Sequence, residues 1–170
     1  MSNPDFQVRP EHAGDVQALR ELAARTFGPG RFVRSAYRVR EGTEPVKGLS
    51  LTAWEGESLA GSVRFTAIHI GSKAGALLLG PLMVDGKWAG KGCGRALIGR
   101  GLELAREQGY ALVLLVGDLP YYERFGFRRV PAGQIMLPGP VDPARLLAVE
   151  LMPDALKTFE GWVRGAGARG

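Results

Sequence analysis

Residues 77–127 read LLLGPLMVDGKWAGKGCGRALIGRGLELAREQGYALVLLVGDLPYYERFGF and are the most informative part of the chain. They contain an apolar run, a glycine-rich loop, a helix-forming segment, a second apolar run and a turn with two adjacent tyrosines. The apolar runs over 76–84 and 111–116 are typical of strands that are buried on both faces. We therefore predict a strand, a helix and a second strand joined in a right-handed parallel crossover.

The segment between these two strands has the periodicity of an amphipathic helix. Apolar or small residues recur at helical spacing, and charged residues occupy the opposite face. The first group contains Leu97, Ile98, Gly101, Leu102, Leu104 and Ala105, and the second contains Arg100, Glu103, Arg106 and Glu107. Gly109 is expected to end this helix.

The residues before this stretch are expected to add a strand, a helix and a hairpin. Residues 6–9 alternate as a strand does, and Asp15 is expected to open a helix that ends at 28–30. Residues 49–54 and 59–70 predict a hairpin. Polar and apolar residues mix in its second strand, so one face of that strand is expected to look toward solvent or a cleft.

Other segments are less regular. Residues 31–40 fit either a short second helix or a lid over a substrate pocket. Prolines and glycines over 131–145 predict a loop, and 146–151 predict a last strand. A short helix is expected over 153–162, with Pro153 in its first turn.

The composition is that of a globular protein. Of the 170 residues, 45% are hydrophobic and 23% are charged, and no run of about 18 apolar residues could span a membrane. The length suits one domain over 1–170, with a core over about 6–130 and a tail over 131–170. The N-terminus lacks the regions of a secretory signal, so a cytoplasmic location is expected.

Charge and cysteine content narrow the classes of partner. A formal net charge of +5 favours an anionic partner, such as a nucleic acid, an acidic surface or a phosphorylated small molecule. The basic residues are scattered, and only Arg128 and Arg129 are adjacent, which argues against nucleic-acid binding. A single cysteine, Cys93, excludes an internal disulfide and a metal site made of several thiolates.

The glycine-rich loop lies between the first buried strand and the helix. Such a loop directs backbone N–H groups and the positive end of the helix dipole toward one point, where a phosphate binds. The dinucleotide fingerprint fails, because Leu97 stands where its third glycine should be, and the Walker pattern is absent. The alternative is a plain strand-to-helix turn.

The loop sequence Ala89-Gly90-Lys91-Gly92-Cys93-Gly94 resembles the acetyl-CoA signature Gln/Arg-x-x-Gly-x-Gly/Ala of the GCN5-related N-acetyltransferases, the GNAT family. The segments LGPLMV and GDLPYYERFGF resemble the flanking parts of the family core, particularly in its YhbS-like branch. This resemblance implies a single-domain α/β fold. Its sheet would be mixed, twisted and mostly antiparallel, with one parallel crossover and helices on both faces.

The resemblance also implies acetyl-CoA as co-substrate and a set of residues that hold it. The backbone of Leu82, Met83 and Val84 would pair with the pantetheine arm, and the N–H near Val84 would polarise the thioester carbonyl. The pyrophosphate would bind at the loop, formed by Ala89, Gly90, Lys91, Gly92, Cys93, Gly94 and Arg95. Ala89 departs from the family pattern, so either the affinity for acetyl-CoA is lower or another cationic residue, such as Lys91 or Arg95, compensates for the lost side-chain contact.

Tyr122 occupies the position from which the family's tyrosine reaches the coenzyme sulfur. It would act either as a general acid or as a hydrogen-bond donor to the leaving thiolate, because full proton transfer is uphill by roughly 2 kcal/mol from ordinary pKa values. The alternative is that Tyr121 and Tyr122 are core aromatics. Cys93 is expected to pack in the fold rather than act as a nucleophile.

The sequence does not select the base that deprotonates the attacking amine. The base that deprotonates the amine would be Glu55, His69, Asp85 or water. No metal is implied. We expect transfer of acetyl from acetyl-CoA to a primary amine by direct attack in a ternary complex. The alternatives are a non-catalytic CoA-binding module and, less favoured, a basic nucleic-acid-binding domain. The acceptor would be a small molecule or a peptide amine, and a homodimer would agree with the family.

Overall fold

The computed structural model describes residues 5–27 and 43–167, so the helix or lid predicted over 31–40 lies outside the described residues. The strands are β1 (Gln7–Pro10), β2 (Leu51–Glu55), β3 (Ser58–Ile70), β4 (Lys73–Val84), β5 (Leu112–Val116), β6 (Arg128–Arg129), β7 (Ile135–Met136), β8 (Leu146–Glu150) and β9 (Gly161–Gly165). The helices are α1 (Val16–Phe27), α3 (Cys93–Glu107) and α4 (Leu119–Tyr122). In the described part of the chain, no helix is long and apolar enough to cross a membrane.

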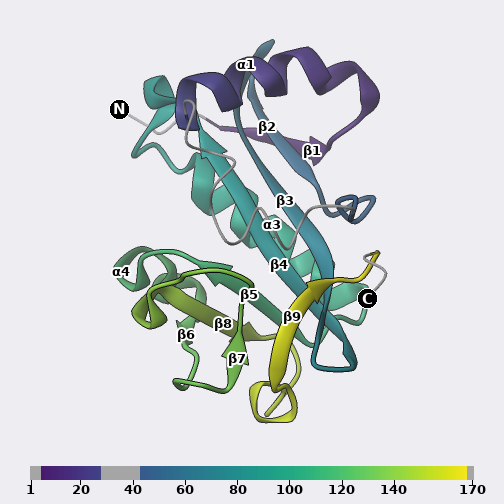
Figure 1. The fold of residues 1–170 in the computed structure, drawn as a ribbon. Coiled ribbons are helices and arrows are strands. Elements are labelled where there is room, and N and C mark those ends of the chain that lie inside the picture. Colours follow the sequence, from purple (N-terminus) through teal and green to yellow (C-terminus); the bar gives the residue numbers. More distant parts are fainter. Residues whose placement is uncertain (1–4, 28–42, 168–170) are drawn as a thin grey trace.

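The strands form one mixed sheet in the order β1-β2-β3-β4-β5-β8-β6, with β9 on β3 and β7 on β9 (Figure 1). The pairs β4–β5 and β7–β9 are parallel, and the other pairs are antiparallel. Strand β4, helix α3 and strand β5 form the predicted parallel crossover. The mixed, mostly antiparallel sheet expected from the sequence is therefore confirmed.

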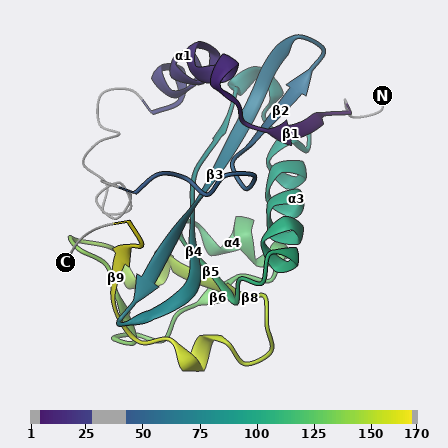
Figure 2. The ribbon, with the colours of Figure 1, turned by 90° about the vertical axis from the view of Figure 1, so that its right-hand side faces the viewer.

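Helices cover both faces of the sheet, as predicted. Leu97 of α3 packs with Val63 and Phe65 of β3 in the largest core cluster. Leu22 of α1 packs with Met83 of β4 in a separate cluster. Alternate residues of a strand point to opposite faces, so α1 and α3 lie on opposite sides of β3 and β4, as Figure 2 shows.

Strands β4 and β5 diverge soon after they pair. Their pairing is confined to residues 76–78 of β4 and 112–114 of β5. Beyond it, β4 continues beside β3, with Gly80 and Pro81 opposite the single residue Arg64. Such a bulge bends and twists its strand, and Pro81 has no N–H to offer a neighbour. We call the opening between residues 79–84 and 115–116 the fork.

The C-terminal part corrects one prediction. The helix expected over 153–162 is wrong, because this stretch holds a 3₁₀ turn at Leu156–Thr158 and the start of β9. The spacing of Leu156, Phe159 and Val163 suits a helix, but residues 68–70 of β3 offer a free edge with which β9 pairs. Non-local pairing therefore outweighed the local pattern. The six predicted strands lie within a few residues of their bounds, whereas the short strands β6 and β7 were not predicted, and β7 lies in the stretch expected to be a loop.

Candidate active site

The loop before α3 has the conformation that its glycines permit. Gly90 and Gly92 adopt φ values of 72° and 93°, where other side chains would be strained. Gly92 caps α3, and its carbonyl accepts the N–H of Ala96 at 3.0 Å. The N–H groups at 93–95 belong to the first turn, so they have no acceptor within the helix. We call these three groups the anion nest.

Positive side chains surround the anion nest. Lys91 and Arg95 are exposed, and within the described residues neither forms an ion pair. Arg124 lies over the ring of Tyr121, 5.0 Å from its centroid. Ala89 is exposed at the start of the loop and offers no polar side chain. The cations near the nest therefore come from other positions than the family signature uses.

The edge of β4 that faces the fork carries free backbone groups. The N–H of Asp85 donates to the carbonyl of Ala60 at 2.8 Å, and the carbonyl of Met83 lies beside Gly61, so both point toward β3. Because backbone groups alternate along a strand, those of Leu82 and Val84 point into the fork. The side chain of Met83 packs toward α1, only 4% exposed.

Tyr122 ends α4, directly after β5. Its ring covers Gly117, where a Cβ atom would lie 2.5 Å from the ring. It also makes edge contacts with Phe127 and Tyr121, at centroid distances of 5.8 and 4.9 Å. Burial raises the pKa of Tyr122 to about 12. The phenol therefore stays protonated across the physiological range.

Tyr121 approaches the anion nest, a contact that sequence reasoning missed. Its hydroxyl lies against the Cα of Gly94 in the space that a Cβ atom would occupy. Burial raises the pKa of Tyr121, while the charges of Arg124 and Arg95 act in the opposite direction. The adjacent tyrosines thus face different places, since Tyr121 meets the nest and Tyr122 the end of β5. The paired tyrosines in the sequence are the signal that pointed to this region.

Cys93 is buried inside the fold. Its sulfur lies beside Gly61 of β3, and its side chain belongs to the core cluster with Leu97. Burial raises the pKa of this thiol to about 11. A neutral, buried thiol is a poor nucleophile, so the geometry supports the expected packing role.

The candidate bases are placed unequally. Asp85 accepts hydrogen bonds from the N–H of Lys87 at 3.0 Å and from Arg25 at 3.1 Å. His69 lies eight residues along β3 from Gly61, the partner of Val84, which is roughly 25 Å at about 3.3 Å per residue. Glu55 lies at the tip of the β2–β3 hairpin. No contact of the described residues directs the side chain of Asp85, His69 or Glu55 toward the fork.

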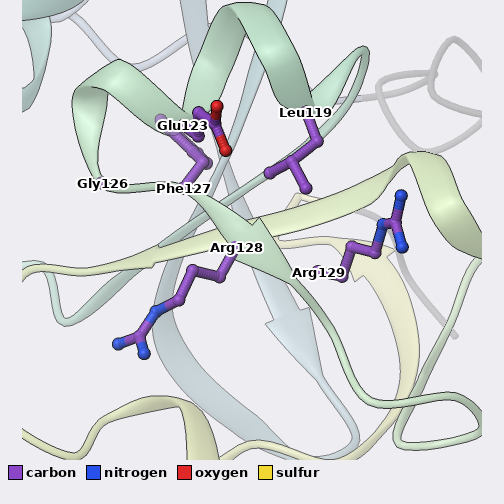
Figure 3. A pocket seen from close by; sticks show the side chains of 6 residues that line it. All are labelled: Leu119, Glu123, Gly126, Phe127, Arg128 and Arg129. Atoms are coloured by element: carbon purple, nitrogen blue, oxygen red, sulfur yellow. The ribbon is translucent and has the colours of Figure 1, made fainter.

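A shallow hollow of about 520 Å³ lies outside the fork, between α4 and β6 (Figure 3). Its lining residues are Leu119, Glu123, Gly126, Phe127, Arg128 and Arg129. Strand β6 is at the end of the sheet and β8 separates it from β5, whereas the fork opens on the β4 side of β5. The hollow and the fork are therefore different sites, and Phe127, which lines the hollow, packs against Tyr122.

A diverging parallel strand pair, a free strand edge and an anion nest at the next helix together define the acyltransferase fold that the sequence resembled. Comparison with known proteins agrees with this class. The model of the acetyltransferase (GNAT) family matches residues 16–127. The chain belongs to this family, which makes it an acyltransferase.

Relatives of this chain include YhbS, an uncharacterised N-acetyltransferase of Escherichia coli strain K12. It is 30% identical over 157 residues, which cover 92% of this chain and 93% of that protein. The crystal structure of E. coli YhbS in complex with CoA has a TM-score of 0.81 and 27% identity, covering 97% of this chain and 93% of that one. A GNAT family acetyltransferase from Brucella melitensis, in complex with acetyl-CoA, has a TM-score of 0.71 and 27% identity, covering 96% and 97%.

Proposed function

We propose that this protein transfers an acetyl group from acetyl-CoA to a primary amine by direct attack in a ternary complex. The observation that carries the proposal is the fork, whose free strand edge leads to the anion nest of α3. An extended chain with amides can pair with such an edge as an additional strand. A diphosphate suits the nest and its neighbouring cations. The coenzymes in the two similar structures have both features.

The site residues then have distinct tasks. The nest at Cys93, Gly94 and Arg95 holds the diphosphate, and Gly90 and Gly92 shape the loop. The backbone of Leu82 and Val84 pairs with the pantetheine amides. The N–H of Val84 donates to the thioester carbonyl oxygen and stabilises the negative charge that develops there when the amine attacks. The C–N bond forms as the C–S bond breaks, and CoA leaves as a thiolate.

Tyr122 assists the departure of this thiolate by hydrogen bonding. With a pKa of about 12, its phenol would lose its proton to a thiolate of conjugate-acid pKa about 8.5 only at a cost of roughly 5 kcal/mol. A donated hydrogen bond needs no such transfer and still stabilises the leaving group. Of the two roles that the sequence left open, we therefore favour the donor role.

The attacking amine must lose its proton first. Asp85 is engaged with Arg25 and Lys87, and His69 stands eight residues along β3 from the partner of Val84. Glu55 lies at the tip of the β2–β3 hairpin, with β3 between its strand and β4. These placements favour water as the proton acceptor among the four candidates. With proton release to solvent, the rate would rise with pH in proportion to the fraction of the acceptor amine that is unprotonated.

The Tyr122→Phe variant tests the proposal in a thiol-release assay with acetyl-CoA and a panel of amines. We expect kcat to fall about 10- to 100-fold, because one hydrogen bond to a charged group is worth roughly 1.5–3 kcal/mol. The affinity for acetyl-CoA, measured by calorimetry, should stay nearly unchanged. Tyr110→Phe, at a half-buried tyrosine beyond the C-terminal end of α3, is the matched control and should retain full activity.

The other outcomes assign the alternatives. Unchanged turnover in Tyr122→Phe would remove Tyr122 from the mechanism. Tight acetyl-CoA binding without acetylation of any amine would indicate a non-catalytic CoA-binding module. The feature that suggests this alternative is Ala89, which is exposed where the family signature has Gln or Arg.

A further inference from the structure

Strand β6 ends the sheet, and its outer edge is open. Within residues 5–27 and 43–167, β8 is the only strand that pairs with it. The N–H of Val130, next to β6, donates to the carbonyl of Leu146 at 3.0 Å, which fixes the direction of the backbone groups. Because these groups alternate along a strand, the N–H and C=O of Arg129 point away from β8. They are available to a further strand.

The side chains around β6 divide between the two faces of the sheet. Val130 packs in the core cluster to which β9 contributes, whereas Phe127 packs in the α3 cluster. Alternation then places Arg129 on the same face as Phe127, toward α4, and Arg128 on the opposite face. Arg128 lies 3.7 Å from Glu150. Among the described residues, the side chain of Arg129 has no hydrogen bond or ion pair, so its charge is unused.

The hollow beside this edge is open to solvent. Its volume is about 520 Å³, and its lining residues Gly126 and Arg129 are exposed. Leu119 projects into it from α4 and is half-buried. Figure 3 shows Glu123 at the Gly126 end and Arg129 at the other end. A ligand can therefore reach an apolar contact, an unpaired guanidinium and a free strand edge from the same side.

The charges of β6 disfavour a second copy of this chain at the edge. Two such edges paired with each other would bring arginines opposite arginines, and like charges in that position destabilise a strand pair. Charged residues on short edge strands prevent pairing of this kind. The same charges attract a strand that carries acidic residues. Complementary charge therefore indicates the kind of partner that fits.

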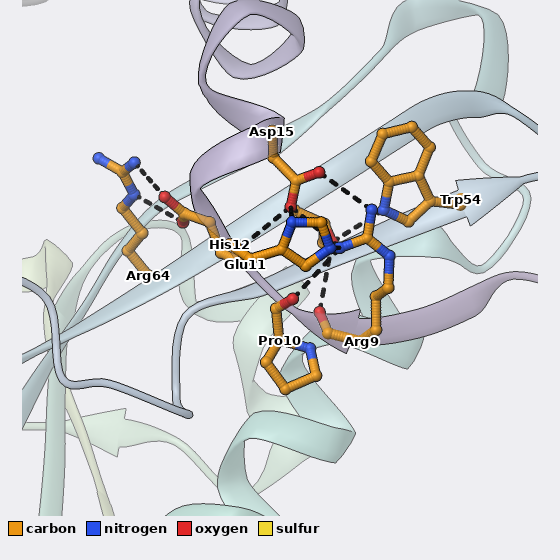
Figure 4. Close-up of polar contacts among 8 residues, drawn as sticks. Arg9, Pro10, Glu11, His12, Asp15, Trp54 and Arg64 are labelled. Carbon is orange, nitrogen blue, oxygen red and sulfur yellow. Dashed lines mark hydrogen bonds and ion pairs between the residues drawn. The ribbon is translucent and has the colours of Figure 1, made fainter.

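The β1 end of the sheet lacks this bias, because its arginines already have acidic partners. Arg9 donates two hydrogen bonds to Asp15, both at 3.0 Å (Figure 4). Arg64 donates two to Glu11, at 2.6 and 3.1 Å. The unpaired charge of Arg129 thus distinguishes the β6 end.

We propose that the outer edge of β6 and the hollow form a docking surface for an acidic, extended segment of a partner protein. The segment adds a strand antiparallel to β6 and exchanges backbone hydrogen bonds with Arg129. A carboxylate opposite Arg129 pairs with its guanidinium, and the next residue is opposite Arg128. The residue after that is on the hollow's face, where Leu119 accepts an apolar side chain and Glu123 repels an acid. The partner sequence is therefore acidic, acidic and apolar, in that order.

The test measures binding of a fluorescein-labelled peptide, Thr-Val-Glu-Glu-Leu-Thr-Val, to the protein by fluorescence anisotropy. One control peptide has lysine in place of both glutamates. Another has N-methyl groups on the first glutamate and the leucine, whose N–H groups would face β6. We expect the wild type to bind the acidic peptide at least about tenfold more tightly than either control, since one loses the charge attraction and the other the backbone hydrogen bonds.

Arg129→Glu tests the side chain. It should weaken binding of the acidic peptide by at least about tenfold and strengthen binding of the lysine peptide, because the charge of the edge is reversed. Arg106→Glu is the matched control, since Arg106 is exposed on α3 and changes the net charge equally. This control should alter the affinity for the acidic peptide less than about twofold.

Four results would overturn the inference. The first is no binding of the acidic peptide at about millimolar concentration. Equal affinity for the N-methylated peptide would mean that charge attracts the peptide without a strand being added, and this comparison needs no variant to fold. Equal affinity of the wild type and Arg129→Glu would place the peptide elsewhere. A wild type that is dimeric in analytical ultracentrifugation, with a monomeric Arg129→Glu, would make a second copy the occupant.

Discussion

Gly94 and Tyr121 are fitted to each other at the start of α3. The Tyr121 hydroxyl lies where a side chain at position 94 would begin, whereas the ring carbon that bears this hydroxyl is 3.6 Å from that point, an ordinary contact distance. The family signature allows either glycine or alanine here, so the pairing with tyrosine is what makes glycine necessary in this chain. Tyr121 thereby supports the backbone of the anion nest at Gly94.

Gly94→Ala should raise the KM for acetyl-CoA and destabilise the fold by about 1–3 kcal/mol, because the new methyl group displaces Tyr121 or the first turn of α3. Tyr121→Phe in the same chain should recover most of both losses, since it removes the hydroxyl alone. Urea unfolding and acetyl-CoA kinetics on the double-mutant cycle measure this coupling.

Gly99→Ala is the control for this cycle. A Cβ atom at position 99 of α3 meets nothing within 4 Å, so alanine there should stabilise the helix by up to about 1 kcal/mol. Equal effects at positions 94 and 99, or no recovery with Tyr121→Phe, would contradict the pairing of Gly94 with Tyr121.

Among the elements, β9 has the least support in the local sequence. It occupies the edge of β3 beyond the end of β2, and its side chains alternate in exposure, with Val163 at 3% and Trp162 at 60%. Val163 packs with Ile68, Ile70 and Phe159 in one cluster. Strand β9 therefore covers the core cluster that contains Ile68, Ile70 and Phe159.

A counterintuitive order of stabilities follows for β9. Val163→Ala should lower the free energy of unfolding by about 2 kcal/mol, because it leaves a cavity in the core. Trp162→Ala removes a much larger side chain, yet it should cost less than about 0.5 kcal/mol because the indole is exposed. Urea denaturation of the two variants compares them directly, and the reverse order would refute the strand.

The elements also show what local patterns can and cannot predict. The apolar runs around α3 and the alternation over residues 59–70 were sufficient to place β3, β4 and β5. The same alternation led to the expectation of a strand face toward solvent or a cleft. It did not indicate that Ser62 and Thr66 would be fully buried, because their cover depends on segments distant in sequence. The fork was likewise an implication of the family resemblance and not of strand propensity.

At the scale of the whole molecule, the buried thiol of Cys93 couples stability to pH. Its pKa is about 11 in the fold and 9.0 in the unfolded chain. The unfolded state therefore loses the proton first as pH rises. The stabilisation linked to this proton is fully present below pH 9 and is lost, by about 2 to 3 kcal/mol, as pH rises to about 11.

Cys93→Ala isolates this effect. The variant should be less stable than the wild type at pH 7, because it leaves a small cavity. The difference should shrink toward pH 10.5, because the variant has no thiol to ionise. Guanidinium unfolding at several pH values measures the difference, and a constant gap across this range would contradict burial of the thiol.

The donor side of the molecule was more predictable from sequence than the acceptor side. Residues 82–95 are contiguous, so a short motif could specify the strand edge and the nest. The role of Tyr122 could be predicted only from the family resemblance, although Tyr122 lies in a single sequence motif with Gly117 and Phe127. On the face of the sheet opposite α3, Arg64 of β3 donates to Glu11 and Thr52 of β2 donates to the carbonyl of Arg9, so segments distant in sequence meet there. No linear motif describes such an arrangement.

The bulge opposite Arg64 has a consequence for the protein before any ligand arrives. An unpaired strand edge is a template on which other chains can aggregate. Here the edge of β4 is recessed, because β5 lies beside it in the same sheet. The fork is already formed in the folded protein. On binding, the conformational entropy that is lost is therefore mainly that of the ligand. A narrow, unbranched chain can enter where another protein's strand would be kept out.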